Sequence, residues 1–189
     1  MSDLHLYLQD QLSSTDETVL DPDIQVTIHH DCIYQHTIAR INYTTYDVQR
    51  DQDLINPRIG KCAIMVYHPT TPGVSSRPWV FASVLDIYHT LILRPGMSEP
   101  KRMEFLWVRW MHTVDIFTHG PAVKHMKRVA FEPLSSPNAF GFINPAQVIR
   151  ACHLIPAFHH IHITDLPSVA RDPEGDWRYY YVNRCVMSH

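Results

Sequence analysis

Glycine is scarce in this chain of 189 residues, which holds six glycines against 14 prolines. That balance argues against long helices and for frequent chain reversals. No apolar run approaches the roughly 20 residues needed to cross a bilayer, and no Cys-x-x-Cys pair occurs among Cys32, Cys62, Cys152 and Cys185. Because the start is polar and acidic and does not resemble a secretory leader, we expect reduced, mostly buried thiols in an intracellular protein.

Catalytic motifs are missing as well. The sequence contains no Gly-x-Ser-x-Gly nucleophile elbow, no phosphate-binding glycine loop and no carboxylate pair at helical spacing. A net charge of −3 gives no overall attraction to nucleic acid or to an anionic membrane, so nucleic-acid binding would need a local patch. We therefore expect a protein that is not an enzyme, needs no cofactor and does not associate with membranes.

Short runs of β-branched and aromatic residues fill the middle of the chain and predict strands. The longest run, residues 79–93, is apolar on both faces and predicts a long central strand or a bent strand pair. A change of phase at Thr44-Thr45 predicts a β-bulge, residues 51–61 predict a loop, and Pro145 predicts the start of a short helix. The other expected strands are residues 24–30, 36–48, 62–69, 103–111 and 127–134.

These elements predict a mainly β fold, a small partly open β-barrel with one short helix and flexible termini. Residues 1–21 are acidic and lack apolar periodicity, which predicts a flexible lead-in. Residues 22–165 are expected to form the barrel-like domain. Residues 166–189 are expected to form an irregular tail, with either a last strand or a strand-like segment at 176–184.

Two clusters of histidine and cysteine raise the question of a zinc site. Zinc needs about four nitrogen or sulfur ligands in a tetrahedral array. The spacing of the first cluster, within residues 29–36, is tolerable, whereas that of the second, within residues 152–162, is irregular. Histidines on strand edges and packed cysteines are therefore the favoured interpretation. In the zinc alternative the ligands would come from His29, Cys32, His36, Cys152 and His153.

Basic residues alternate with aromatic ones in two further stretches, a mixture typical of stacking surfaces that bind nucleic acid on small β-barrels. Tryptophans on alternating strand positions are, however, more often core residues. The nucleic-acid candidates are Arg102, Trp107, Arg109, Lys124, Lys127 and Arg128. The aromatic residues would equally line a groove for a protein partner, and the sequence leaves both uses open.

Several segments together resemble a known block. They are TIARINYTTYDVQRDQDLINPR, PWVFASVLDIYHTLI, KRMEFLWVRWM, AFGFINPAQVIRACHLIPAF and DWRYYYVNR. The block resembles the C-terminal region of proteins encoded by basidiomycete DNA transposons of the KDZ, Plavaka and CACTA-like kind, from about Asp21 to Arg184. The resemblance implies a non-catalytic accessory module in the nucleus, with a protein or nucleic-acid partner. No transposase catalytic residue has a match here, and the chain is expected to be a truncated fragment.

Overall fold

The computed structural model describes residues 2–15, 26–44, 49–60, 62–67, 79–95, 97–114, 127–158, 162–163 and 176–183. Two residues named above, Lys124 and Cys185, lie outside the described residues. So does Thr45, where the strand expected at 36–48 should change phase through a β-bulge.

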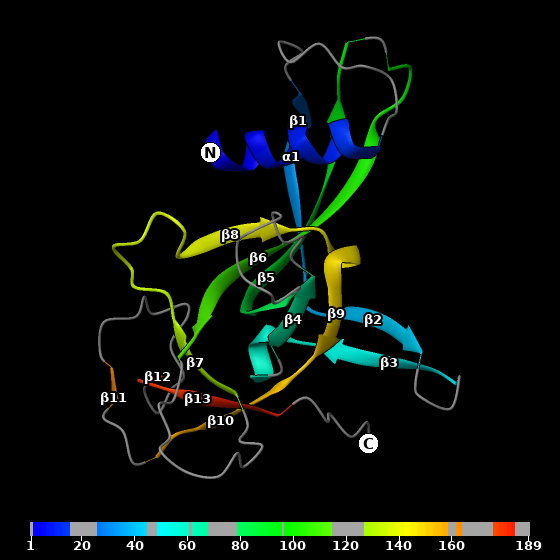
Figure 1. Cartoon of the computed structure of the whole chain (residues 1–189). Coiled ribbons are helices and arrows are strands. Elements are labelled where there is room, and N and C mark those ends of the chain that lie inside the picture. Colours follow the sequence, from blue (N-terminus) through cyan, green and yellow to red (C-terminus); the bar gives the residue numbers. More distant parts are fainter. Residues whose placement is uncertain are drawn as a thin grey trace.

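A nine-stranded antiparallel sheet forms the body of the protein (Figure 1). Its strand order is β10-β13-β7-β6-β5-β4-β9, with β1 beside β5 and β8 beside β6. The strands are β1 (Thr27–His36), β4 (Ala63–Tyr67), β5 (Trp79–Leu93), β6 (Lys101–Thr113), β7 (Lys127–Phe131), β8 (Phe140–Ile143), β9 (Val148–Ala151), β10 (His153–Pro156) and β13 (Tyr180–Asn183). The prediction of a mainly β fold is confirmed, and no sheet of the described residues closes into a barrel through its hydrogen bonds.

Two smaller pairings complete the β structure. β2 (Ala39–Thr44) and β3 (Arg50–Ile55) form a hairpin, and β11 (His162–Ile163) pairs with β12 (Asp176–Trp177). The expected loop at 51–61 is therefore wrong over its first half, because those residues pair with β2 and bury Asp53 and Ile55. Asn56 and Pro57 do end the strand as expected of turn-forming residues, because a short 3-10 turn, η1 (Pro57–Ile59), follows Asn56.

The β5–β6 hairpin is the longest element of the sheet and confirms the strand expected at 79–93. Its register shifts between Val84 and Asp86, so Leu85 is an extra residue on β5. A bulge of this kind bends the strand and exchanges its two faces. One half of the hairpin joins the body of the sheet, and the other half carries β1 and the helix α1 (Figure 1).

Alternate residues of the central strands enter two apolar cores on opposite faces. One core includes Ile64, Val84 and Val108 and is covered by Ile41 and Ile55 of the β2–β3 hairpin. The other core collects side chains from six segments around the strand order, namely Ala63, Phe81, Met111, Val129, Cys152, Tyr180 and Val182. The period of two along each strand accounts for this division.

The helix α1 (Ser2–Thr15) packs on the outer half of the β5–β6 hairpin (Figure 1). Its buried residues Leu4, Leu8 and Leu12 are spaced by four, so they lie on one face of a helix, against Ile92 and Phe105. The predicted flexible lead-in at 1–21 is therefore wrong for residues 2–15. Three leucines form only a narrow apolar stripe. This pattern is too weak to predict a buried helix face without knowledge of the strands on which it packs.

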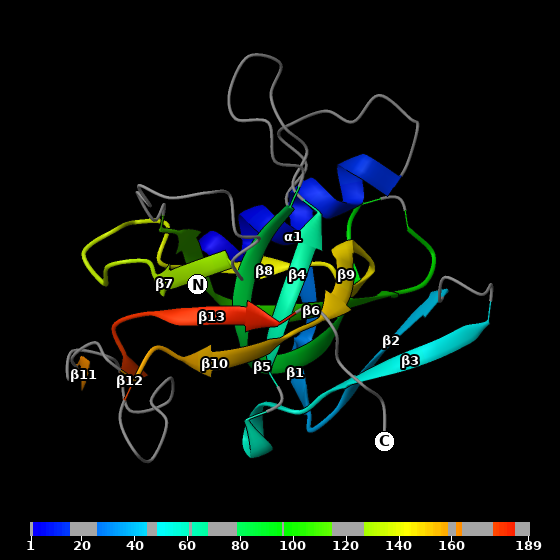
Figure 2. The same ribbon diagram turned by 60° about the horizontal axis from the view of Figure 1, so that its bottom comes forward.

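The chain joins the two ends of the strand order directly. β9 and β10 stand at opposite ends of that order, yet only Cys152 separates them in the sequence (Figure 2). Before β9, Pro145 opens a 3-10 turn, η2 (Pro145–Gln147), with a capping box formed by Asn144 and Gln147. The expected short helix is thus a single turn, because strand pairing of β9 with β4 takes over at Val148.

Candidate functional site

The five predicted zinc ligands do not converge. Among the described residues, no three or more His, Cys, Asp or Glu side chains are grouped so that they could hold a metal ion. His29 and Cys32 lie in an irregular part of β1, where the register jumps between Ile28 and Ile33. Cys32 is exposed, so the prediction of buried thiols is wrong there, and its Sγ donates to the His30 carbonyl at 3.2 Å.

The remaining members of that set occupy separate places. His36, at the end of β1, contacts His89 of β5 instead of Cys32. Cys152 is buried in the core between β9 and β10, which agrees with its expected packing role, and the next residue, His153, is exposed. The alternation of a strand sends these neighbours to opposite faces, so they do not act as a ligand pair.

The predicted nucleic-acid residues are also divided. Arg109 is only 2% exposed, and its Nη2 donates to the Glu132 carbonyl at 2.7 Å. Its guanidinium lies 5.3 Å from the ring centre of Phe131 and 5.1 Å from that of Phe140. Arg109 therefore links β6 to its neighbours inside the fold, and its expected role on a binding surface is wrong.

Trp107 and Arg102 lie elsewhere on β6. Trp107 is half-buried and packs on the Phe140 ring at a centroid distance of 5.9 Å. Arg102 is exposed and pairs with Glu104 at 2.8 Å. Neither residue interacts with Lys127 or Arg128 in the described part of the chain, so the five described candidates form no single patch.

Lys127 and Arg128 do meet aromatic rings, on the β7–β13 side of the sheet. The Arg128 guanidinium lies 4.6 Å from the centre of the Tyr179 ring, and that of Arg178 lies 5.4 Å from the same ring. Lys127 Nζ lies 4.9 Å from the Trp79 ring centre. Arg128 is also directly opposite Tyr181 in the β7–β13 ladder.

We call Arg128, Arg178, Tyr179 and Tyr181 the arginine–tyrosine face. Tyr180 and Val182 point into the core, so the alternation of β13 turns Tyr181 outward, and Arg178 is exposed. The sequence carried one signal for this face, the run of aromatics at 179–181. It gave no sign that those residues would pair with Arg128, which lies some 50 positions earlier.

A second polar cluster fastens the β2–β3 hairpin to β9. The Asp53 carboxylate, 3% exposed, accepts from Arg150 Nε at 3.0 Å and from the Ala151 N–H at 2.8 Å. The Arg150 guanidinium lies 3.5 Å from the centre of the Tyr43 ring, and the Tyr43 hydroxyl donates to Asp51 at 2.7 Å.

The pKa shifts in this cluster follow from those contacts. Burial lowers the pKa of Arg150, but the hydrogen bond and charge of Asp53 outweigh it, so the pKa stands above its usual value. The pKa of Tyr43 is raised, chiefly because its hydroxyl donates to the Asp51 carboxylate. Every member is engaged with another, so the cluster reads as a structural clamp between hairpin and sheet.

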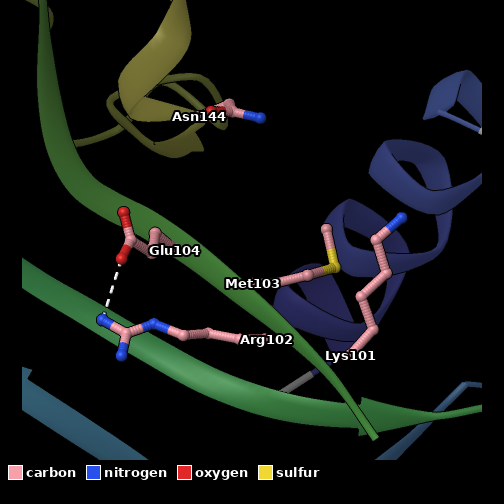
Figure 3. Close-up of a pocket in the computed structure, with 5 residues that line it drawn as sticks. All are labelled: Lys101, Arg102, Met103, Glu104 and Asn144. Atoms are coloured by element: carbon pink, nitrogen blue, oxygen red, sulfur yellow. Dashed lines mark hydrogen bonds and ion pairs between the residues drawn. The ribbon is translucent and has the colours of Figure 1, made fainter. Parts of the chain in front are cut away.

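An open depression of about 310 Å³ lies beside the outer half of β6 (Figure 3). Its lining is Lys101, Arg102, Met103, Glu104 and Asn144. Figure 3 shows Lys101 and Met103 extending toward α1, whereas Arg102 and Glu104 are turned toward each other. Asn144 Nδ2 donates to Gln11 Oε1 of α1 at 3.1 Å. The depression thus lies at the boundary between α1 and the sheet.

No family model matches the sequence, and neither a curated protein nor a solved structure matches it. No helix in the described part of the chain is long and apolar enough to cross a membrane. Function is therefore inferred from the side chains themselves.

Proposed function

We propose that this protein is a non-catalytic interaction module, derived from a fungal transposon-encoded protein, that binds single-stranded nucleic acid in the nucleus. The observation that supports this is the arginine–tyrosine face, where Arg128 and Arg178 both lie over the ring of Tyr179. The resemblance of the sequence to transposon-encoded proteins agrees with such a partner.

The chemistry of the face suits a nucleic-acid strand. Bases stack on tyrosine rings and on guanidinium planes, and phosphates accept hydrogen bonds from arginine. Tyr181, beside Arg128 in the ladder, extends the aromatic surface. A net charge of −3 makes a local basic patch necessary for binding a nucleic-acid strand.

We infer further that the sheet curls into a partly open barrel beneath this face. The support for it is that β9 and β10, at opposite ends of the strand order, are joined through one residue, Cys152. Six segments around that order also contribute to one core. A curved, closed-in sheet would hold the face rigid for stacking.

Fluorescence anisotropy with a labelled oligothymidine of about 12 nucleotides tests the proposal. The length is chosen because small β-barrels that bind single strands by stacking cover roughly 4–16 nucleotides each. We expect binding at about 50 mM salt that weakens at about 200 mM. Tyr179→Ala should weaken it about tenfold, because a stacked base contributes roughly 1–3 kcal/mol.

Tyr34→Ala is the matched control, because Tyr34 is an exposed tyrosine on β1, away from the face. It should bind as the unchanged protein does. An absence of binding at low salt, or equal affinities of the Tyr179 and Tyr34 variants, would rule out this function.

Protein binding along β1 is a second candidate. β1 pairs with β5 along one edge, and among the described strands none pairs with its other edge. Ile33 and Tyr34 of this strand are 39% and 48% exposed. Such an edge accepts an extended partner segment as an added strand. A bound partner is then expected to slow hydrogen exchange of the β1 amides, and Ile33→Lys should abolish its binding. Unchanged exchange of these amides in the presence of the partner would refute binding along β1.

A further inference from the structure

Two histidines are in contact on the outer half of the β5–β6 hairpin, where β1 pairs with β5. His36 Nε2 of β1 and His89 Nδ1 of β5 lie 2.6 Å apart. The Tyr34 ring stacks on His89 at a centroid distance of 4.7 Å and an interplanar angle of 14°, which holds that imidazole in place. On the other side of His89, the β5–β6 ladder places Glu104 directly opposite.

We propose that His36 and His89 form a binding site for a borderline divalent transition metal, Zn²⁺ or Cu²⁺, with Glu104 as a third ligand. Imidazole nitrogen and carboxylate oxygen are ligands that these ions take. The site differs from the zinc set expected from the sequence, in which His36 stood with Cys32. It is also independent of nucleic-acid binding, because none of its residues belongs to the arginine–tyrosine face.

The facing nitrogens define where the ion would sit. At their separation one ring donates its proton to the lone pair of the other. A metal ion would replace that shared proton. Two nitrogens on a tetrahedral Zn²⁺ are about 3.3 Å apart, because each Zn–N bond is about 2.0–2.1 Å, so the rings need to separate by less than about 1 Å.

The third ligand is held elsewhere in the metal-free protein. Glu104 pairs with Arg102, and their side chains are 57% and 53% exposed. Exposed pairs of this kind contribute little stability, so the carboxylate is available to turn toward the ion. In the present geometry the described residues form no three-ligand group, so Glu104 has to leave Arg102 to complete the site.

Arg102, which pairs with Glu104, brings a positive charge to the site. Arg102 also repels the ion, and its removal should help binding in two ways, by freeing Glu104 and by removing a positive charge.

Calorimetric titration of the chelator-treated, tag-free chain with Zn²⁺ tests the site. His36→Gln and His89→Gln should each remove the tightest binding event. Glu104→Gln should weaken it about tenfold or more, because losing a ligand costs at least as much as losing a residue that only orients one. Arg102→Gln should strengthen it. His112→Gln is the matched control, since His112 is a β6 histidine that faces Glu132; it should bind as the unchanged protein does.

An unmutated complex provides a second readout, in case a histidine variant loosens β1. The electron paramagnetic resonance spectrum of the protein with one equivalent of Cu²⁺ should show two nitrogen ligands. A Cu²⁺ spectrum without two nitrogens, or a His89→Gln protein that is folded and binds Zn²⁺ as tightly as before, would overturn the site. Weaker binding by Arg102→Gln would overturn the role of Glu104.

Discussion

Removal of the Asp53 carboxylate is the perturbation that most sharply tests how the β2–β3 hairpin is held. Asp53 accepts hydrogen bonds from Arg150 and from the Ala151 N–H of β9, and its side chain is 1% exposed. Asp53→Ala leaves a guanidinium without its counter-ion and a backbone N–H without its acceptor. Asp53→Asn keeps an oxygen that can still accept from the Ala151 N–H.

The magnitude follows from how deeply each partner is buried. Breaking a buried ion pair from one side costs about 3–5 kcal/mol. The Arg150 side chain is 28% exposed, so water reaches the guanidinium and reduces that cost. We expect the free energy of unfolding to fall by about 3 kcal/mol for Asp53→Ala. For Asp53→Asn we expect about 1.5 kcal/mol, the lower end of the range for a charge-assisted bond, because water reaches Arg150.

Urea unfolding followed by tryptophan fluorescence measures the difference. With a denaturant slope of about 2 kcal/mol/M, Asp53→Ala should lower the midpoint by roughly 1.5 M. Glu104→Ala, measured in chelator, is the control, because it breaks the exposed pair with Arg102 and should cost no more than about 1 kcal/mol. If Asp53→Ala costs no more than Glu104→Ala, the cluster does not clamp the hairpin.

Two further predictions concern α1 and the outer half of β5. Leu8 is fully buried, so Leu8→Ala should lower the free energy of unfolding by about 2–5 kcal/mol in the same urea assay; a cost below about 0.5 kcal/mol would mean that the helix does not pack on the sheet. Burial, with donation to Asp86, raises the pKa of Tyr88 from 10.0 to about 12. The folded state therefore holds this proton more tightly, and the stability it contributes is complete below pH 10.0 and is lost as pH rises toward about 12. Unfolding measured across that range should depend less on pH in Tyr88→Phe, and an unchanged dependence would contradict the assignment.

The strands with strong local patterns could be predicted from the sequence. The stretch at 79–93 is apolar on both faces because β5 has a neighbour on each side and a core on each face. β3 could not be recognised, because its buried Asp53 is acceptable only beside Arg150, which lies far along the chain. The leucines of α1 likewise have meaning only above Ile92 and Phe105.

The candidate site was predicted less well than the fold, for a related reason. The basic character of Lys127 and Arg128 beside aromatics is visible in the sequence, but the ring on which Arg128 lies, Tyr179, precedes a strand that pairs with β7 only in the tertiary structure. Arg109 looked like the same kind of residue, yet the cross-strand positions of Phe131 and Phe140 enclose it. Charge is visible in a sequence, whereas the side of the sheet on which it lies is not.

The salt dependence of oligonucleotide affinity tests the central proposal most directly. Each arginine that neutralises a phosphate contributes about 0.7 to the slope of log affinity against log salt for a single strand. We predict that Arg128→Gln and Arg178→Gln each reduce the slope by about that amount, whereas Arg102→Gln leaves it unchanged. Equal slopes for the unchanged protein and for the Arg128 and Arg178 variants would contradict nucleic-acid binding on the arginine–tyrosine face.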